Sequence, residues 1–213
     1  MSEEPLRDEL LTPRVESSEV LFTGHVWDVR RDTFELAGEQ LVREVVDHPG
    51  AVAVLALDEQ DRVLLIRQYR HPVASREWEI PAGLLDVAGE DPLLAAQREL
   101  AEEADVVAEH WALLVDYFSS PGGLNEALRI YLARGLSPVP EEERHEREGE
   151  EAHIITRAVP LEEVVDAVLG GDLHNATLLV GALAAHRMRE GGWRSLRPAD
   201  SPWPDHPAHR RQS

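Results

Sequence analysis

Three glutamates crowd one short stretch of this chain, and their spacing suits the binding of a hard divalent cation. Glu99 and Glu103 stand four residues apart, so they share one face if the stretch is helical, and Glu102 lies beside them. Like charges at this spacing repel each other. Arg98 can neutralise part of the charge, and a cation that prefers oxygen ligands can neutralise more. The stretch therefore predicts a metal site, with a solvated acidic helix as the alternative.

A glycine-bearing loop followed by a short helix would position these side chains. Asp91 can cap the helix, and Pro92 suits its first turn. Residues at helical spacing form an apolar stripe that would pack on the core: Leu93, Ala96, Leu100 and Ala104. We therefore expect a helix that begins after Asp91 and carries the three glutamates on another face.

Residues 81–106 resemble the Nudix box, in which Gly, five residues, Glu, seven residues and Arg-Glu-apolar-x-Glu-Glu-x-Gly-apolar follow one another. The matching positions are Glu90, Arg98, Glu99, Leu100, Glu102, Glu103 and Val106. Two positions depart from this pattern. Gly83 lies one residue too far from Glu90, and Asp105 replaces the last glycine. Because Asp tolerates a left-handed backbone better than most other residues, we interpret both changes as loop adjustments that leave the carboxylates in place.

The resemblance assigns a role to each of these residues. It implies ligands for two or more Mg²⁺ or Mn²⁺ ions: Glu99, Glu102, Glu103 and the backbone carbonyl of Ala82. Arg98 is expected to orient the carboxylates through a bidentate ion pair. Glu90 is expected to support either the metal or the loop.

Three further motifs resemble the ADP-ribose pyrophosphatase branch of the Nudix family. In chain order they are Arg67-Gln-Tyr-Arg70, Trp78-Glu-Ile-Pro-Ala-Gly83 and Ser120-Pro-Gly-Gly-Leu-Asn-Glu126. The implied reaction is Mg²⁺-dependent hydrolysis of ADP-ribose to AMP and ribose 5-phosphate, in which water attacks one phosphorus in line. Hydrolysis of another nucleoside-diphosphate sugar is an alternative. A second is a non-catalytic sensor that binds ADP-ribose, although such modules typically lose the box glutamates that this chain has.

The same resemblance assigns five residues to the substrate: Arg70, Glu79, Glu126, Trp27 and Arg43. Arg70 would clamp a phosphate, unless it is an ordinary surface arginine. Glu126 would contact the substrate or a nearby water. Trp27 would stack on adenine and Arg43 would contact the base, but both could equally be ordinary strand residues.

A general base must reach the attacking water. In this branch the base is a glutamate in the loop before the last strand. That loop is long and acidic here, and it offers Glu148, Glu150 and Glu151. Glu151 aligns best and Glu150 next. A solvated acidic loop is the alternative, in which case Glu102 could be the base instead.

The composition excludes several other kinds of chemistry. The chain has no cysteine, which excludes disulfides, thiol nucleophiles and cysteine-ligated zinc. It also has no lysine, which excludes a Walker A loop and a Schiff base. The formal net charge of −20 argues against nucleic-acid binding. Because no apolar run reaches transmembrane length and residues 1–4 do not begin a signal peptide, we expect no membrane partner and a cytoplasmic location.

The order of predicted elements indicates an α/β fold. The 213 residues suit one domain with a small appendage, and 43 % of them are hydrophobic, which suffices for a core. We expect strands over 20–30, 31–46, 51–57, 63–70, 111–118, 126–133 and 153–159, with helices over 161–170 and 175–190. Residues 1–18 are expected to be loosely held.

The resemblance implies the Nudix α-β-α sandwich, with a mixed sheet and a small N-terminal antiparallel sheet. We expect N-terminal strands over 1–47, a Nudix domain over 48–191 and a tail over 192–213. In the branch that the chain resembles, the N-terminal strands exchange between the subunits of a homodimer. A homodimer with swapped strands is therefore expected.

Overall fold

The computed structural model describes residues 6–147, 149 and 151–210, without the side chains of 151, 209 and 210. The chain divides into two compact units. The first unit comprises Met1–Pro49, Ser120–Glu126 and Trp203–Ser213, and the second comprises Gly50–Ser119 and Ala127–Pro202. None of the helices in the described part of the chain has the length and apolarity needed to cross a bilayer.

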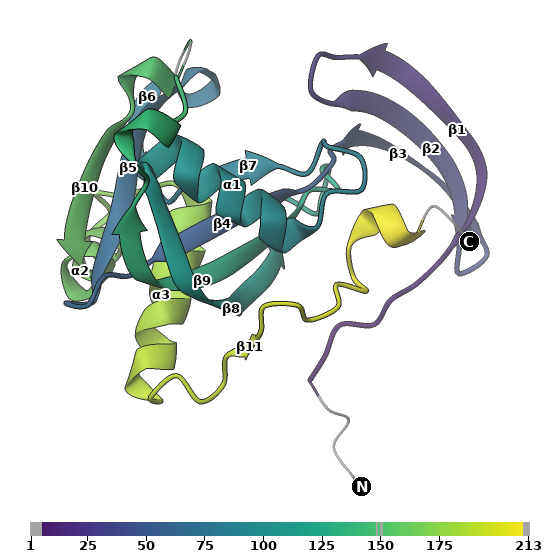
Figure 1. Ribbon diagram of the computed structural model, residues 1–213. Helices are drawn as coiled ribbons and strands as arrows, with labels where there is room; N and C mark the ends of the chain where they lie inside the picture. The colour runs from purple at the N-terminus through teal and green to yellow at the C-terminus, as the bar shows by residue number, and fades with distance from the viewer. Residues whose placement is uncertain (1–5, 148, 150, 211–213) are drawn as a thin grey trace, which may run out of the picture. The chain divides into compact units, whose positions relative to one another are not determined.

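The second unit is built on a five-stranded mixed sheet (Figure 1). Its strands lie in the order β11, β8, β9, β4 and β7: Arg197–Pro198, Val106–Phe118, Ala127–Pro138, Ala51–Ala56 and Ala82–Leu84. β4 pairs with β9 in parallel and with β7 antiparallel. Every residue of β4 is buried, as the continuous apolar run predicts.

A second sheet of this unit and three helices complete the architecture. The sheet has the order β10, β5 and β6: Ile155–Pro160, Arg62–Arg70 and Ser75–Glu79. A 3₁₀ turn, η1 (His71–Val73), joins β5 to β6. The helices are α1, α2 and α3: Pro92–Ala104, Leu161–Gly170 and Ala176–Glu190.

Alternation along β4 divides the core into two halves. Val52 and Val54 belong to the half that contains Leu100 of α1. Leu55 belongs to the half that contains Leu178 of α3. Because successive strand residues point to opposite faces, β4 packs on a helix from either side. Figure 1 shows α1 and α3 on opposite sides of the sheet. The predicted α-β-α sandwich is confirmed.

The residues that predicted the box helix also form its two ends in the structure. The Asp91 side chain accepts a hydrogen bond of 2.8 Å from the Leu93 amide, and proline occupies the first turn. Asp105 forms the C-cap in the left-handed region, with φ 54° and ψ 36°. The departure from glycine at this position therefore leaves the helix end intact.

Several boundaries differ from the prediction. β1 (Arg14–Thr23) begins inside the segment expected to be loosely held. β8 begins at Val106 because β9 supplies a partner as far as Pro138. The acidic loop contains two 3₁₀ turns, η2 (Glu141–Glu143) and η3 (Glu151–His153).

The segment expected to be a tail also contains structure. β11 pairs with β8, with Arg197 opposite Leu113. Trp203 is buried, and η4 spans Pro207–Arg210.

The first unit contains a separate antiparallel sheet of β1, β2 (Asp28–Leu36) and β3 (Glu39–Asp47). The loop 120–126 lies against the end of β3. The Val46 amide donates to the Gly123 carbonyl at 2.9 Å, and the Asn125 side chain donates to Asp47 at 2.9 Å. The loop that ends in Glu126 is thus held by the N-terminal strands.

Candidate active site

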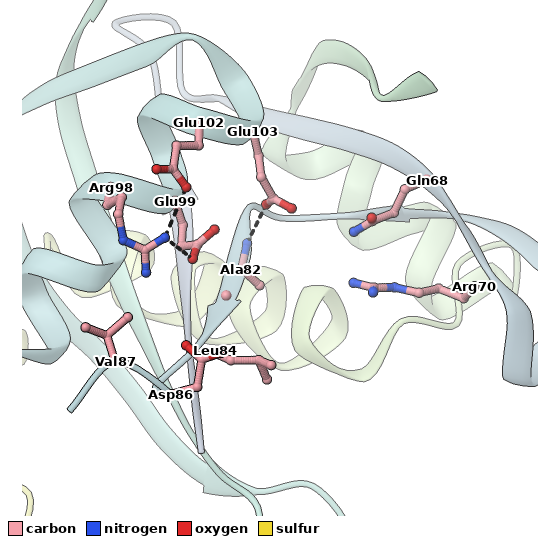
Figure 2. A pocket seen from close by; sticks show the side chains of 11 residues that line it. Gln68, Arg70, Ala82, Leu84, Asp86, Val87, Arg98, Glu99, Glu102 and Glu103 are labelled. Atoms are coloured by element: carbon pink, nitrogen blue, oxygen red, sulfur yellow. Dashed lines mark hydrogen bonds and ion pairs between the residues drawn. The ribbon is translucent and has the colours of Figure 1, made fainter. Parts of the chain in front are cut away.

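A polar cavity of about 400 Å³ lies beside α1 in the second unit (Figure 2). β5, β7, the loop after β7 and α1 contribute its lining: Gln68, Arg70, Ala82, Gly83, Leu84, Asp86, Val87, Arg98, Glu99, Glu102 and Glu103. The structure thus brings the predicted metal-ligand residues together with Arg98 and Arg70. Three glutamates and two arginines around one cavity can bind cations and a polyanion side by side.

Arg98 holds three carboxylates at once. Its Nε and Nη2 donate to the two oxygens of Glu90, each at 3.1 Å. Its Nη1 donates to Glu99 at 2.6 Å and to Glu102 at 3.0 Å. The bidentate partner of Arg98 is therefore Glu90, which does not line the cavity. Hydrogen bonding from Arg98 lowers the pKa of Glu90, and the carboxylates, Glu90 foremost, raise the pKa of the guanidinium.

Glu103 is held by the strand across from the helix. It is buried, and its Oε2 accepts a hydrogen bond of 2.8 Å from the Ala82 amide. The next residue, Gly83, passes so close to α1 that a Cβ there would lie 1.9 Å from Glu99 Oε1. A larger residue at position 83 would therefore displace the Glu99 carboxylate from this place.

A second arginine–glutamate pair supports the opposite side of the cavity. Glu79, which is 2 % exposed, accepts two hydrogen bonds from Arg70, at 2.8 Å from Nε and 2.7 Å from Nη2. Gln68 Nε2 also faces Glu79, at 3.4 Å. Because Arg70 lines the cavity and Glu79 does not, the structure places Glu79 behind Arg70. This bidentate pair fixes the direction in which the guanidinium points.

The donor set fits a small hard cation. Within the described residues, no three acidic or histidine side chains converge into a ready-made metal cage. Arg98 holds Glu99 and Glu102, and the Ala82 amide holds Glu103. Mg²⁺ needs no such cage, because it usually binds one or two carboxylates and keeps several waters. Glu99, Glu103 and the Ala82 carbonyl supply oxygen donors of that kind.

The structure does not describe the side chains of the candidate bases. Glu151 begins η3, and its side chain is not described. Glu150 and Glu148 lie outside the described residues. The prediction that one of these glutamates is the base stays a prediction.

The remaining candidate residues belong to the first unit. The Trp27 ring stacks on the His48 ring with centroids 5.5 Å apart. His48 Nε2 lies 3.4 Å from Glu126 Oε1, so the imidazole lies between the two predicted substrate residues. Burial lowers the pKa of His48 against the opposing effect of Glu126. Arg43 is exposed on β3 and donates to the Val42 carbonyl at 2.7 Å.

Sequence reasoning missed Gln68, Asp86 and His48. Gln68 shares a strand with Arg70 at a spacing of two, and this spacing places both side chains on one face. Strand alternation could therefore have found it. No comparable signal exists for Asp86 or His48, because their places depend on a loop and on a pairing between distant segments.

Comparisons with known proteins match the chain to one family. The family profile described as NUDIX domain matches residues 47–179. The chain is 44 % identical to an ADP-ribose pyrophosphatase of Mycobacterium tuberculosis, over 90 % of this chain and 91 % of that protein. It is 36 % identical to an ADP-ribose pyrophosphatase of Bacillus subtilis, over 75 % of this chain and 85 % of that protein.

A structural relative shares the fold at low sequence identity. The crystal structure of an ADP compounds hydrolase matches with a TM-score of 0.72 at 22 % identity, covering 88 % of this chain and all of that one. At this level of identity, the match concerns the fold.

Proposed function

This chain belongs to the Nudix family of hydrolases, and we propose that it hydrolyses the diphosphate of ADP-ribose to AMP and ribose 5-phosphate. The observation that carries the proposal is the cavity itself. It combines the glutamates of α1 with the guanidinium of Arg70, which Glu79 holds in place. Relatives that cover most of the chain are named ADP-ribose pyrophosphatases, which supports this choice of substrate.

We assign the diphosphate to this cavity because its groups complement a polyanion. Arg70 binds a phosphate oxygen through the part of its guanidinium that faces the cavity, while Glu79 keeps the side chain from turning away. Arg98 keeps Glu99 and Glu102 oriented before substrate binds. Hydrolysis of a diphosphate depends on positioning and charge neutralisation, which such fixed groups provide.

Two or more Mg²⁺ ions, or Mn²⁺ ions in their place, are proposed as the cofactor. Their ligands would be Glu99, Glu102, Glu103 and the Ala82 carbonyl. When bound, such ions neutralise the charge of the diphosphate and make water more acidic. Glu103 accepts a hydrogen bond from the Ala82 amide, so its carboxylate is held beside the residue whose carbonyl is proposed as a further ligand.

A glutamate of the loop before β10 is proposed as the general base, with Glu151 as first choice and Glu150 as second. It accepts a proton from the attacking water as the P–O bond to the leaving phosphate ester breaks. Glu151→Gln should then lower kcat strongly and leave KM nearly unchanged, since the contact matters mainly in the transition state. If Glu150→Gln shows this loss instead, Glu150 is the base. If neither variant does, Glu102 becomes the candidate.

The adenine end of the substrate is assigned to the first unit. Trp27 would stack on the base, Arg43 would contact its edge, and Glu126 would contact the substrate or a water. The stacking of Trp27 on His48 and the approach of His48 to Glu126 keep two of these groups in fixed positions.

A homodimer with exchanged N-terminal strands is proposed because the β1–β2–β3 sheet exposes apolar side chains. They include Val15, Val20, Phe22, Leu36 and Val42. Exposed apolar patches commonly mark interfaces between chains. A fully active monomer at micromolar concentration in sedimentation analysis would contradict this assembly. The cytoplasmic location expected from the sequence stays a prediction.

The experiment that tests the reaction is product analysis with the full chain and Mg²⁺. ADP-ribose should yield AMP and ribose 5-phosphate in equal amounts, and Glu103→Gln serves as the matched control without a metal-ligand carboxylate. A panel of other nucleoside-diphosphate sugars tests the first alternative. Faster turnover of another sugar would replace ADP-ribose as the substrate. Tight binding of ADP-ribose without turnover would indicate the sensor instead.

A further inference from the structure

We propose that Arg147 is a positioning residue, which ties the loop carrying the candidate base to the C-terminal end of the metal-binding helix. Its partner is Asp105, the residue that stands where the Nudix box pattern has glycine. The inference rests on the proposed function, because it assigns the tie to that reaction. Its geometry does not depend on which sugar is cleaved.

Arg147 makes two contacts with the last turn of α1 and its cap. Its Nη2 lies 2.6 Å from Asp105 Oδ2, and its Nε donates to the Glu102 carbonyl at 2.7 Å. The side chain is largely buried, with 18 % of its surface exposed. The last carbonyls of a helix lack intrahelical partners and form the negative end of its dipole. A guanidinium there satisfies both the carbonyl and the charge.

Asp105 also holds the other end of the same loop. The Val139 amide donates to the Asp105 carbonyl at 2.9 Å, and Val139 is buried. The segment 140–146 therefore leaves from the backbone of Asp105 and returns to its carboxylate through Arg147. Compact surface loops whose ends lie close together are often functional.

The contacts of Arg147 shorten the unanchored span of chain that carries the candidate base. β10 is fixed by its pairing with β5 from Ile155 onward. With Arg147 fixed as well, the chain between 147 and 155, whose sequence includes the candidate bases, is a short span between two anchored points. Without the anchor, the span would begin at Val139 and be about twice as long. A longer free span defines the position of a carboxylate less well, and small misplacements of a reacting group are costly.

The ion pair with Arg147 explains why Asp105 can stand where the box pattern has glycine. Glycine would adopt the same left-handed backbone with less strain. It would also keep the carbonyl that accepts from Val139. It has no carboxylate for Arg147, however, so the returning end of the loop would lose its ion pair.

The test compares variants at each side of the ion pair. Arg147→Gln and Asp105→Asn each remove one charge, and Asn tolerates the left-handed backbone at position 105. We expect each to lower kcat about 10-fold, as for other residues that orient catalytic groups, with KM and the Mg²⁺ concentration for half-activity unchanged. The double variant should lose no more than either single variant, because both remove one interaction. Arg147→Lys should restore part of the rate.

Arg144→Gln is the matched control. Arg144 lies in the same loop, but its Nε donates to the Val139 carbonyl at 3.3 Å and not to α1. It should leave kcat unchanged. Amide hydrogen exchange over 140–147 should accelerate in Arg147→Gln and Asp105→Asn, and this measurement needs no substrate.

The possible results separate the two proposals. If the wild-type chain cleaves nothing in the sugar panel, the proposed function is wrong. Unchanged amide exchange in Arg147→Gln would overturn the tie whether or not the enzyme turns over. Wild-type kcat in Arg147→Gln, or additive losses in the double variant, would overturn the positioning role. A shift in Mg²⁺ dependence equal to the loss of kcat would instead assign Arg147 to the integrity of the helix.

Discussion

Two clusters in the second unit combine arginine and carboxylate side chains in opposite proportions. Arg98 faces three carboxylates, from Glu90, Glu99 and Glu102. At the other cluster, one carboxylate, Asp116, faces two arginines. Arg129 lies 2.8 Å from it and Arg197 lies 3.0 Å from it.

The two clusters also differ in how far their arginines are exposed to solvent. Arg98, Glu99 and Glu102 line an open cavity, and the Arg98 side chain is 34 % exposed. The Arg129 side chain is 3 % exposed. It also donates to the carbonyls of Ser201 at 2.8 Å and Pro202 at 3.3 Å. The surplus of negative charge at Arg98 is what the proposed cation would neutralise, whereas the charge of Asp116 is already neutralised by arginines of the protein. The proportion of charges thus distinguishes the proposed binding site from a cluster that we interpret as a structural lock.

Loss of a metal-ligand carboxylate should have the largest effect. Glu99→Gln and Glu103→Gln should each lower kcat by about 10²–10³-fold, the cost of removing one charge-stabilising group from an active site. Without metal, Glu99→Gln should melt no lower than the wild type, because it relieves like-charge repulsion. Steady-state kinetics and thermal melting measure the two effects. Near-normal activity of both variants at saturating Mg²⁺ would show that the Arg98 cluster is not the metal site.

The lock should respond in the opposite way. Arg129→Met should destabilise the fold by about 3 kcal/mol, since it removes a buried guanidinium and leaves the half-buried carboxylate of Asp116 with one fewer partner. For a chain of this size that corresponds to a fall in Tm of about 6–12 °C. The turnover of the folded fraction should not change. Arg197→Gln, at an exposed arginine on the same carboxylate, is the control and should cost less than about 1 kcal/mol. A loss of kcat in folded Arg129→Met would show that the Arg129 cluster also serves catalysis.

Added metal should stabilise the protein through the Arg98 cluster. At a Mg²⁺ concentration 100 times its Kd, binding to the folded state contributes about 2.7 kcal/mol. Thermal melting with and without Mg²⁺ should show this gain in the wild type and in Arg197→Gln. It should shrink in Glu99→Gln and Glu103→Gln. An equal gain in all four proteins would place the metal elsewhere.

Glu79 gives the smallest of these effects and tests an intermediate case, in which one carboxylate meets one arginine. Glu79→Gln should raise KM about 10-fold, comparable to the loss of other orienting partners, because Arg70 loses its bidentate support. Glu77→Gln, at a half-buried glutamate of the same strand, is the control. Unchanged KM for ADP-ribose in Glu79→Gln would show that Arg70 needs no support.

The sequence predicted the parts of the site that depend on local structure. Asp91, Pro92 and the apolar stripe of α1 are neighbours in the chain, so capping rules and helical spacing place the glutamates correctly. The continuous apolar run of β4 likewise predicted a strand buried on both faces.

Parts that depend on strand register or on loop contacts were not accessible from the sequence. Glu79 lies behind Arg70 because Ile66 of β5 pairs with Glu79 of β6, and nothing local specifies that register. The tie between Arg147 and Asp105 joins residues 42 positions apart. The stacking of Trp27 on His48 has the same origin, since it joins a loop to the end of β3.

The closure of residues 140–146 on Asp105 has a consequence for engineering the chain. A segment that leaves and returns at one residue can be lengthened without displacing what lies beyond it, because each doubling of loop length adds only about 0.6 kcal/mol of closure entropy. A peptide epitope or a small fluorescent reporter inserted after Glu142 should therefore leave the protein folded and active. The same insertion after Arg147 would lengthen the span between the two anchors and should abolish turnover.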